Sequence, residues 1–575
     1  MVPAGRYPTK DEENVMKNRL WNRKKMAGLM SGVLALSLAA CGSSSQTGST
    51  AAATEAATAA ATAAATEGAA ETGSNIVNIG VTNQLGTLNP LNMDWSFINL
   101  HATSMMFLPL VTVGADNNFN YLLAESVTTD DNLTFTIKIR DDAVWSDGEP
   151  VTADDVIFTI LRMTSPEVAN ANFDFSMFKG FESGTSPEGA ESVDGLVKVD
   201  DKTVQFVANS PMSLNTFINN CCVWICILPS HVLKDVPADQ LATYDWFQHP
   251  DVVDGPYILD DYDSAHYISY HANEKYFLGA PKIAKLNFRI IDPSEVLPQL
   301  KSGEIDFVQP ATCSIPVTDQ EAVQALDGYT VSWTDPITNE MTFFNTKKVT
   351  DANVRKAFVM AIDRQMLVDS LLSGHGEVTD GFVMKSSPLY DDTKETISYD
   401  PDGAKQLLQD AGWDSSTTLQ YYVSSSDDTA VKAAQVIQQE LSEVGISINI
   451  NTVDFDTLMS VAGTDDVDVF SVQYTITPND FYADELGLVD TEGTSWTGGW
   501  TDPDVDTALQ NTQTAKDDTE LTKLYKEIDD KMISDVPMFS LYFQSNLGLV
   551  SNRLKNAEPT LYGSYDNIQD WEITQ

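Results

Sequence analysis

The stretch FTIKIRDDAVWSDGEPVTADDVIF, residues Phe135–Phe158, carries the signals of a strand, a turn and the start of a helix in close succession. From Phe135 to Ile139 every second residue is apolar, which predicts a strand with one buried face. The Asp-Gly pair inside WSDG is typical of a turn. Thr152 stands three residues before Asp155 in a near-match to a capping box, so a helix is expected to begin there.

The chain after residue 74 continues to alternate strand and helix signals. Further strand patterns occupy residues 75–83, 285–293, 304–310 and 446–453. Helical patterns occupy residues 153–164, 294–303, 350–374, 400–412 and 428–445. The expected N-caps of three helices are Ser294, Asp363 and Asp400. Because strands and helices alternate in both halves, the sequence predicts two α/β bodies.

Composition places the chain among folded, strongly acidic proteins. It has 575 residues, of which 42% are hydrophobic, and its formal net charge is −49. Such a surface repels nucleic acid and anionic lipid headgroups, so neither is expected as a partner. No apolar segment after the N-terminal region reaches the length that is needed to cross a bilayer.

The N-terminal region has the layout of a bacterial secretion signal. Residues Met16–Lys25 are basic, and Met26–Ala40 are almost all apolar or small. Leu38–Cys41 resembles a lipobox, whose cysteine receives a diacylglycerol and becomes the first residue of the mature protein. We therefore expect a lipoprotein signal peptide at residues 1–40 and lipidation of Cys41. The alternative is an ordinary secretory signal with a chance cysteine.

Residues 41–74 form a low-complexity segment that consists mostly of alanine, threonine, serine, glycine and glutamate. Such a segment cannot bury enough apolar surface to fold by itself, so a flexible tether is expected. A tether of this length would span roughly 30 Å root-mean-square. Its expected role is to hold a folded body away from a membrane.

Four further cysteines, Cys221, Cys222, Cys226 and Cys313, lie in the part that is expected to fold. Adjacent cysteines point apart on a strand, and no histidine or second cysteine pair completes a zinc pattern. We therefore expect no metal site and no cofactor. The cysteines are predicted to be buried thiols or to form one disulfide.

Nine stretches of the sequence resemble, in the same order, the bacterial extracellular solute-binding proteins of family 5, the oligopeptide and dipeptide transport class. They are Leu123–Ser126, Phe135–Phe158, Asp254–Tyr257, Asn273–Ile291, Leu300–Pro310, Phe343–Arg364, Tyr399–Trp413, Thr501–Gln510 and Val536–Tyr542. One such match carries little information, but nine in series cover essentially all of residues 75–575. The lipobox is the anchor expected of this family in organisms without an outer membrane.

The resemblance implies an α/β fold with two lobes, of the periplasmic-binding-protein type with an extra N-terminal subdomain and two hinge crossings. The expected boundaries are residues 75–311 plus 541–575 for lobe 1, about 112–230 for its subdomain, and 312–540 for lobe 2. The crossings are expected near Gln309–Cys313 and Phe539–Tyr542. A ligand would bind between the lobes, which close over it.

The resemblance also implies a function without chemistry. The chain is expected to be the substrate-binding lipoprotein of an ABC importer, which captures peptides and delivers them to permease subunits and their ATPases. We expect a monomer outside the cytoplasm, anchored through Cys41 to the outer face of the cell membrane, or in the periplasmic space if an outer membrane exists. The alternatives are the same fold with a nickel chelate, haem or an oligosaccharide as ligand, and, more remotely, an anchored surface hydrolase.

In peptide-binding members of the family, an aspartate of lobe 2 holds the amino terminus of the ligand. The position that aligns with it here is Thr477, and the next carboxylate is Asp480. A hydroxyl cannot replace a carboxylate against an ammonium, because charge-assisted hydrogen bonds are about twice as strong as neutral ones. Either Asp480 takes this role or the ligand lacks a free α-amine; alternatively, Asp480 only starts an exposed turn.

Other candidate ligand contacts lie near that segment or in loops that the family places at the cleft. Aromatic residues there either line ligand pockets or belong to the core. The asparagines likewise either contact the ligand or have a structural role. The candidates are Asn89, Asn345, Tyr474, Asn479, Phe481, Trp496 and Trp500.

Overall fold

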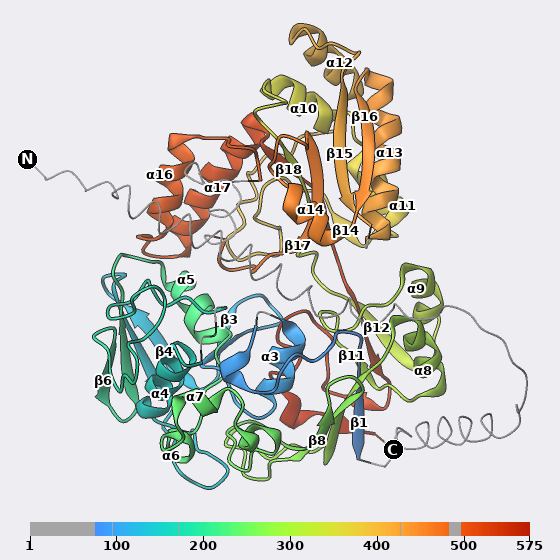
Figure 1. The fold of residues 1–575 in the computed structure, drawn as a ribbon. Helices are drawn as coiled ribbons and strands as arrows, with labels where there is room; N and C mark the ends of the chain where they lie inside the picture. Colours follow the sequence, from blue (N-terminus) through green and yellow to red (C-terminus); the bar gives the residue numbers. More distant parts are fainter. Residues whose placement is uncertain are drawn as a thin grey trace, which may run out of the picture. The chain divides into compact units, whose positions relative to one another are not determined.

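The computed structural model describes residues 75–94, 96–168, 170, 172–425, 427–481 and 496–574 (Figure 1). The predicted signal peptide, the predicted tether and Cys41 lie outside the described residues. Two large β-sheets and a smaller four-stranded sheet organise the described part of the chain. Within the ranges given above, no helix combines the length and the apolar character of a membrane span.

A seven-stranded sheet is built around β1 (Ile76–Val81), in which every residue is buried. The apolar run of β1 fits a central strand, because both faces of such a strand are covered. β1 pairs in parallel with β10 (Lys285–Ile290) and β11 (Phe307–Val308). The antiparallel strands are β8 (Tyr257–Asp263), β9 (Tyr267–Ala272), β12 (Tyr329–Trp333) and β19 (Leu547–Ser551). We call this sheet and the elements that pack on it lobe 1.

A six-stranded mixed sheet is built around β13 (Thr338–Phe344), which is also buried along its whole length. β13 pairs antiparallel with β17 (Val469–Thr475) and β18 (Met538–Gln544). The outer strands are β14 (Gly376–Glu377), β15 (Thr418–Ser424) and β16 (Ser447–Val453), of which β15 and β16 are parallel. This sheet and its helices form lobe 2. The fold is therefore the expected two-lobed α/β fold.

The chain passes between the two sheets through residues 334–337 and again through residues 545–546. The passages run side by side, because the Thr334 N–H donates to the Asn546 carbonyl oxygen at 3.0 Å and the Asn546 N–H to Thr334 Oγ1 at 2.9 Å. Both lie later in the chain than the predicted crossings. The first passage differs because α9 (Val317–Gln324) packs on α8 (Val296–Ser302), and β12 pairs with β19, within lobe 1.

The four-stranded sheet lies within the segment expected to form the extra subdomain. Phe135, Ile137 and Ile139 are buried on one face of β5, as their alternation predicted. The capping box is also confirmed, since the Thr152 N–H donates to Asp155 Oδ2 at 2.8 Å. In sheet order the strands are β4 (Ala124–Thr129), β5 (Thr134–Ile139), β7 (Thr203–Val207) and β6 (Leu196–Asp200), and the capped helix is α4 (Ala153–Met163).

Helices cover the sheet of lobe 2, and their caps follow the sequence. The carboxylates of Asp363 and Asp400 accept hydrogen bonds from the first turns of α11 and α12, as predicted. α13 lies along β15 and β16 and ends at Gly445, whose φ of +92° favours glycine (Figure 1). The helices are α10 (Ala352–Met360), α11 (Arg364–Leu371), α12 (Pro401–Asp410), α13 (Asp428–Val444), α14 (Phe455–Val461), α16 (Pro503–Thr512) and α17 (Asp518–Asp535).

Shorter elements complete the described part of the chain. The helices among them are α3 (Phe97–Ser104), α5 (Leu214–Ile218), α6 (Ser230–Leu233), α7 (Ala238–Leu241) and α8 (Val296–Ser302). Two small ribbons pair β2 (Val111–Val113) with β3 (Phe119–Tyr121) and β20 (Leu554–Lys555) with β21 (Glu572–Ile573). α8 ends at Gly303, as predicted, but Ser294 is not the cap, because Asp292 accepts the N–H of Ser294 at 2.9 Å.

The adjacent cysteines Cys221 and Cys222 lie in a π-helical turn, Asn219–Val223, and not on the strand that we predicted. Both are buried free thiols, as are Cys226 and Cys313. Burial raises the pKa of the Cys313 thiol to about 12, and it raises the pKa of the other three thiols as well. These thiols therefore stay protonated and behave as small core residues.

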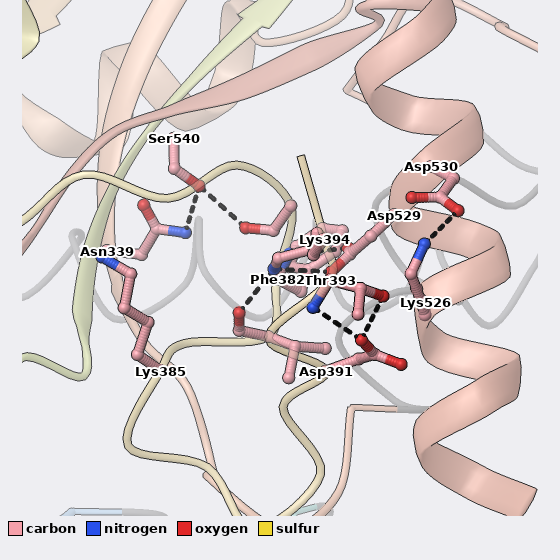
Figure 2. Close-up of polar contacts among 12 residues, drawn as sticks. Asn339, Phe382, Lys385, Asp391, Thr393, Lys394, Lys526, Asp529, Asp530 and Ser540 are labelled. Atoms are coloured by element: carbon pink, nitrogen blue, oxygen red, sulfur yellow. Dashed lines mark hydrogen bonds and ion pairs between the residues drawn. The ribbon is translucent and has the colours of Figure 1, made fainter. Parts of the chain in front are cut away.

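Two buried ion pairs fasten the segment between β14 and α12 to the rest of lobe 2. Lys394 Nζ contacts Asp529 Oδ2 of α17 at 2.8 Å and the Val383 carbonyl oxygen at 2.7 Å (Figure 2). Arg364 of α11 forms a two-pronged contact with Asp380, at 2.5 and 3.2 Å. All four charged side chains are almost fully buried, so each charge depends on its partner.

The Asp529 carboxylate also accepts a hydrogen bond from the backbone of the segment between β14 and α12. Its Oδ1 accepts the Phe382 N–H at 3.1 Å, and a Cβ atom at Gly381 would collide with it. The Gly381 carbonyl oxygen accepts Ser540 Oγ at 2.8 Å, and Asn339 Nδ2 donates to the same hydroxyl at 2.9 Å (Figure 2). The network thus extends from α17 through β18 to the central strand β13.

Replacing Asp529 with asparagine should destabilise lobe 2 by about 3–5 kcal/mol, because it leaves the Lys394 ammonium buried without a counter-charge. Urea unfolding followed by tryptophan fluorescence measures this loss. The control is Asp530→Asn on the same helix, since the Asp530–Lys526 pair at 2.6 Å is partly exposed. That variant should change stability by less than about 1 kcal/mol. Equal losses of stability in the two variants would contradict the conclusion that the buried Lys394 ammonium depends on Asp529.

Candidate functional site

A cavity of about 610 Å³ lies between the two lobes, beside the two chain passages. Lobe 1 contributes Trp333 at the end of β12 and residues 313–316, which follow β11. Lobe 2 contributes Glu340 of β13 and Ser471–Gln473 of β17, and residues 544–547 at the second passage line the cavity as well. Cavities of this size are typical of sites that bind small molecules.

The N-terminal part of α13 forms another part of the wall, through Thr429, Ala430 and Lys432. Asp427, which caps this helix, lines the cavity too, and its Oδ1 accepts the N–H groups of Thr429 and Ala430, each at 2.9 Å. A carboxylate is stabilised at a helix N-terminus by these donors and by the helix dipole. Asp427 therefore brings a negative charge to this side of the cavity.

Glu340 is the buried carboxyl group of the wall, with only 1% of the residue exposed. Glu340 lies on β13, the central strand of lobe 2. In the register of the sheet, its backbone stands opposite Gln473 of β17 on one side and Tyr542 of β18 on the other. Neither of its carboxyl oxygens has a hydrogen-bond partner among the described residues. Burial, and then the charge of Asp427, raise the pKa of Glu340 well above its usual range.

An aromatic stack connects the two lobes at the cavity. The rings of Trp333 from β12 and His375, which precedes β14, lie 3.6 Å apart between centroids and are inclined by only 10°. The His375 carbonyl oxygen accepts the N–H of Ser545 in the second passage at 3.1 Å. Burial lowers the pKa of His375, so its imidazole is neutral at neutral pH. The stack thus presents an uncharged, flat surface to the cavity.

None of the nine residues predicted as ligand contacts, all of which are described, lines this cavity. Tyr474 and Thr477 come nearest in sequence, because they follow the wall residues Ser471–Gln473 at the end of β17. Tyr474 is exposed, and Thr477 is half-buried. Both therefore remain candidates for contact with a ligand that extends beyond the cavity.

Asp480 lies in a buried polar contact between the extra subdomain and lobe 2. Its Oδ1 accepts a hydrogen bond from Thr216 Oγ1 of α5 at 3.1 Å and another from the Tyr525 hydroxyl of α17 at 3.4 Å. The exposed turn that we considered as an alternative is not observed, since only 3% of Asp480 is exposed. The carboxylate is therefore engaged in holding α5 against α17.

Asn479 and Phe481, on either side of Asp480, take part in the same contact. The Asn479 carbonyl oxygen accepts Asn215 Nδ2 at 2.9 Å, and the Asn479 side chain donates to the Asn117 carbonyl oxygen at 3.4 Å. Phe481 packs edge-on against Tyr525, with 5.3 Å between ring centroids. Both residues thus serve the packing between segments that are far apart in the sequence.

The two candidate asparagines outside this segment fix loops. The Asn89 side chain accepts the Leu91 N–H at 3.0 Å and donates to the Leu241 carbonyl oxygen at 3.1 Å. Asn345 Nδ2 donates to the Thr464 carbonyl oxygen at 2.8 Å. Both amides are buried, and their hydrogen bonds go to the backbone.

The two candidate tryptophans pack within lobe 2. Trp496 lies edge-on to Phe343 and Phe470, with ring centroids 5.3 and 5.8 Å apart. Trp500 is buried, and its Nε1 donates to Asp535 Oδ2 at 3.3 Å. This matches the core reading of these aromatics, which the sequence left open.

The sequence pattern did not single out Glu340, Asp427, Trp333 or His375, although all four line the cavity. One signal was present for Glu340, because it is the one charged residue in the strand TNEMTFF, whose other members are apolar or small polar residues. Such a charge in the middle of a buried strand is unusual and points to a special role. The other three come from segments that only the fold brings together.

Replacing Asp480 with alanine should lower the free energy of unfolding by about 1–3 kcal/mol, because the hydroxyl groups of Thr216 and Tyr525 lose their acceptor. The same variant should bind ligand as the wild type does. The control is Asp466→Ala, since Asp466 is exposed. Chemical denaturation and ligand titration of both variants test this assignment. A loss of affinity without a loss of stability would instead place Asp480 in the binding site.

Comparison with known proteins gives a match to a family model along most of the chain. The model of the bacterial extracellular solute-binding proteins, family 5 (middle region), matches residues 118–517. The oligopeptide-binding protein AppA of Bacillus subtilis is 24% identical over 504 residues, which cover 82% of this chain and 87% of AppA.

Solved structures share the two-lobed fold. AppA of Bacillus subtilis in complex with a nonapeptide has a TM-score of 0.64 at 21% identity, over 87% of this chain and 99% of AppA. CtaP of Listeria monocytogenes has a TM-score of 0.73 at 22% identity, over 87% and 99%. NikZ of Campylobacter jejuni in complex with Ni(L-His) has a TM-score of 0.67 at 22% identity, over 87% and 100%.

Proposed function

The chain belongs to family 5 of the bacterial extracellular solute-binding proteins, and on this premise we propose that it captures peptides for an ABC importer. The observation that carries this proposal is the cavity of about 610 Å³ with walls from both lobes. A ligand in that cavity touches both lobes at once, so its binding energy favours the arrangement in which they are close together.

Peptides suit this cavity for a physical reason. A peptide main chain offers the same N–H and C=O groups whatever its side chains are, so pairing with them gives affinity without dependence on sequence. Side chains can then occupy a hydrated space, where water molecules adapt at little cost. The polar wall residues Ser471, Gln473 and Gln544 supply donors and acceptors of this kind. The similarity to AppA of Bacillus subtilis, which is named an oligopeptide-binding protein, also supports peptides as the ligand.

A non-peptide solute in the same fold is the second candidate, because the similar structure of NikZ contains Ni(L-His). The neutral imidazole of His375 on the wall would suit a metal chelate, since neutral histidine is a common metal ligand. We favour peptides, and we propose that either ligand is released unaltered to permease subunits and their ATPases. Haem and oligosaccharide, and the remote hydrolase alternative, have no such specific support.

Members of this family act outside the cytoplasm, and we propose that Cys41 anchors this chain as a monomer to the outer face of the cell membrane. The anchor would be a pair of acyl chains on the thiol, since stable attachment requires two chains. The acidic tethered body would then stay near the membrane without adhering to anionic headgroups.

The purified protein should bind short peptides and should not cleave them. A peptide at a hundred times its dissociation constant should stabilise the protein by about 2.7 kcal/mol, because it binds only the folded state. Thermal unfolding with mixtures of tripeptides to nonapeptides measures the gain, and mass spectrometry of the recovered peptides tests their integrity. Recovery of only metal chelates or sugars from the purified protein would refute the peptide assignment, and cleaved peptides would indicate an enzyme.

Replacing Cys41 with serine should abolish lipid attachment, because serine has no thiol to accept the diacylglycerol. In a bacterial host fed with labelled palmitate, the wild type should carry the label and fractionate with membranes, and the variant should not. The control is Cys313→Ser, a buried cysteine of the folded part, which should keep the label. Label that persists in the Cys41 variant would refute the anchor.

A further inference from the structure

Glu340 differs from the two buried ion pairs described above, because no cationic side chain pairs with it among the described residues. Lys394 is paired with Asp529, and Arg364 with Asp380. Glu340 is buried to the same degree, but neither oxygen has a hydrogen-bond partner among the described residues. Isolated buried carboxylates are strongly unfavourable, and an unsatisfied one in a native protein calls for an explanation.

The position of Glu340 suggests where its partner comes from. The residue lines the cavity between the lobes, so its carboxyl group lies beside the space that a bound molecule would occupy. Both carboxyl oxygens are covered in the structure, so contact with a ligand requires the side chain to turn toward that space. The neighbouring carboxylate of Asp427 already accepts two N–H groups of α13, and it adds negative potential without neutralising Glu340. Lys432 lines the same cavity, but it forms no ion pair with Glu340 in the described part of the structure.

We propose that the Glu340 carboxylate binds a cationic group of the ligand, either an ammonium or a guanidinium, inside the cavity. This inference rests on the proposed function and specifies the ligand class. A cation of this kind supplies several N–H donors and a positive charge, which together satisfy both carboxyl oxygens. In a peptide the cation comes from the α-amine or from a lysine or arginine side chain, and the test below separates these sources.

Binding of a cation at Glu340 must depend on pH, with a defined sign. Because its pKa is raised, the empty site holds the carboxyl group neutral up to a higher pH than an exposed glutamate. A cation requires the ionised form, so binding releases up to one proton. Affinity therefore rises with pH, by at most about tenfold per pH unit, and levels off above the raised pKa. The titratable groups near it are Asp427, Tyr421 of β15 and Tyr542 of β18, and elsewhere on the wall His375 and Lys432.

The test compares cationic probes with uncharged probes of the same shape. N-acetyl-Ala-Lys-Ala-amide is paired with N-acetyl-Ala-norleucine-Ala-amide, and Ala-Ala-Ala-amide with its N-acetyl form. Isothermal titration calorimetry of the full mature chain should show that the wild type prefers the cationic member of one pair by at least about tenfold. Preference within the first pair identifies a side-chain cation, and preference within the second identifies the α-amine.

Glu340→Gln should abolish that preference, because glutamine keeps the shape and removes the charge. The matched control, Glu188→Gln, changes an exposed residue that does not line the cavity, and it should keep the preference. The pH profile of the wild type needs no substitution, so the inference stays testable even if the variant folds poorly. Equal affinity of the wild type for both members of each pair, or a preference that persists in Glu340→Gln, overturns the inference.

Failure of the proposed function has a different signature. If the wild type binds none of the four probes, the peptide assignment fails, and the molecules released from the purified wild type and Glu340→Gln proteins decide the inference. Amines or guanidines that are present in the wild type and absent from the variant support the role of Glu340. Their absence from the wild type overturns it.

Discussion

The two chain passages at residues 334–337 and 545–546 are the constraint on which the arrangement of the lobes depends. They join a seven-stranded sheet to a six-stranded sheet, and they are hydrogen-bonded to each other through Thr334 and Asn546. Among the described residues the lobes are otherwise joined by non-covalent contacts, and the cavity lies directly beside the passages. A small change of angle at the passages would therefore change the space that is available to a ligand.

The polar interior of lobe 2 shows how such a wall stays defined. The ion pairs Lys394–Asp529 and Arg364–Asp380 satisfy each buried charge from within the lobe. Their hydrogen bonds continue through Ser540 to Asn339, the neighbour of Glu340 on the central strand. The strand β13, which carries the unpaired Glu340, is thus held through Asn339 and Ser540 by groups whose own hydrogen bonds are made. Rigid support of this kind is what positions a binding group accurately.

Local patterns in the sequence predicted much of the fold. The alternation in Phe135–Ile139, the capping box at Thr152 and the caps at Asp363 and Asp400 all appear in the structure. These signals work because they involve residues within a few positions of one another. The adjacent cysteines were assigned to the wrong local structure, since buried apolar runs are similar in strands and helical turns.

The candidate site was predicted less well, because a cavity wall is assembled from distant segments. Asp480 was identified as a carboxylate near the expected cleft, yet its hydroxyl partners come from α5 and α17. Trp333 and His375 belong to different lobes, and no spacing in the sequence relates them. The first passage was also predicted too early in the chain. β12 pairs with β19 in the sheet of lobe 1, and local sequence patterns do not indicate which of the two sheets a strand joins.

The sequence by itself determined the α/β class, the central buried strand of lobe 1 and the helix caps at Thr152, Asp363 and Asp400, since these depend on composition and on contacts between near neighbours. Nine stretches that resemble family 5 determined the family. Only the tertiary structure decided where the chain passes from one lobe to the other. It also decided that Glu340 lines the cavity, whereas the carboxylate of Asp480 holds α5 against α17. The physical reason is that Glu340 and Asp480 are both buried acids, and burial alone does not distinguish them. The difference is made by partners from remote segments. Folding supplies hydroxyl donors from α5 and α17 to Asp480 Oδ1, whereas both oxygens of Glu340 are left for a ligand.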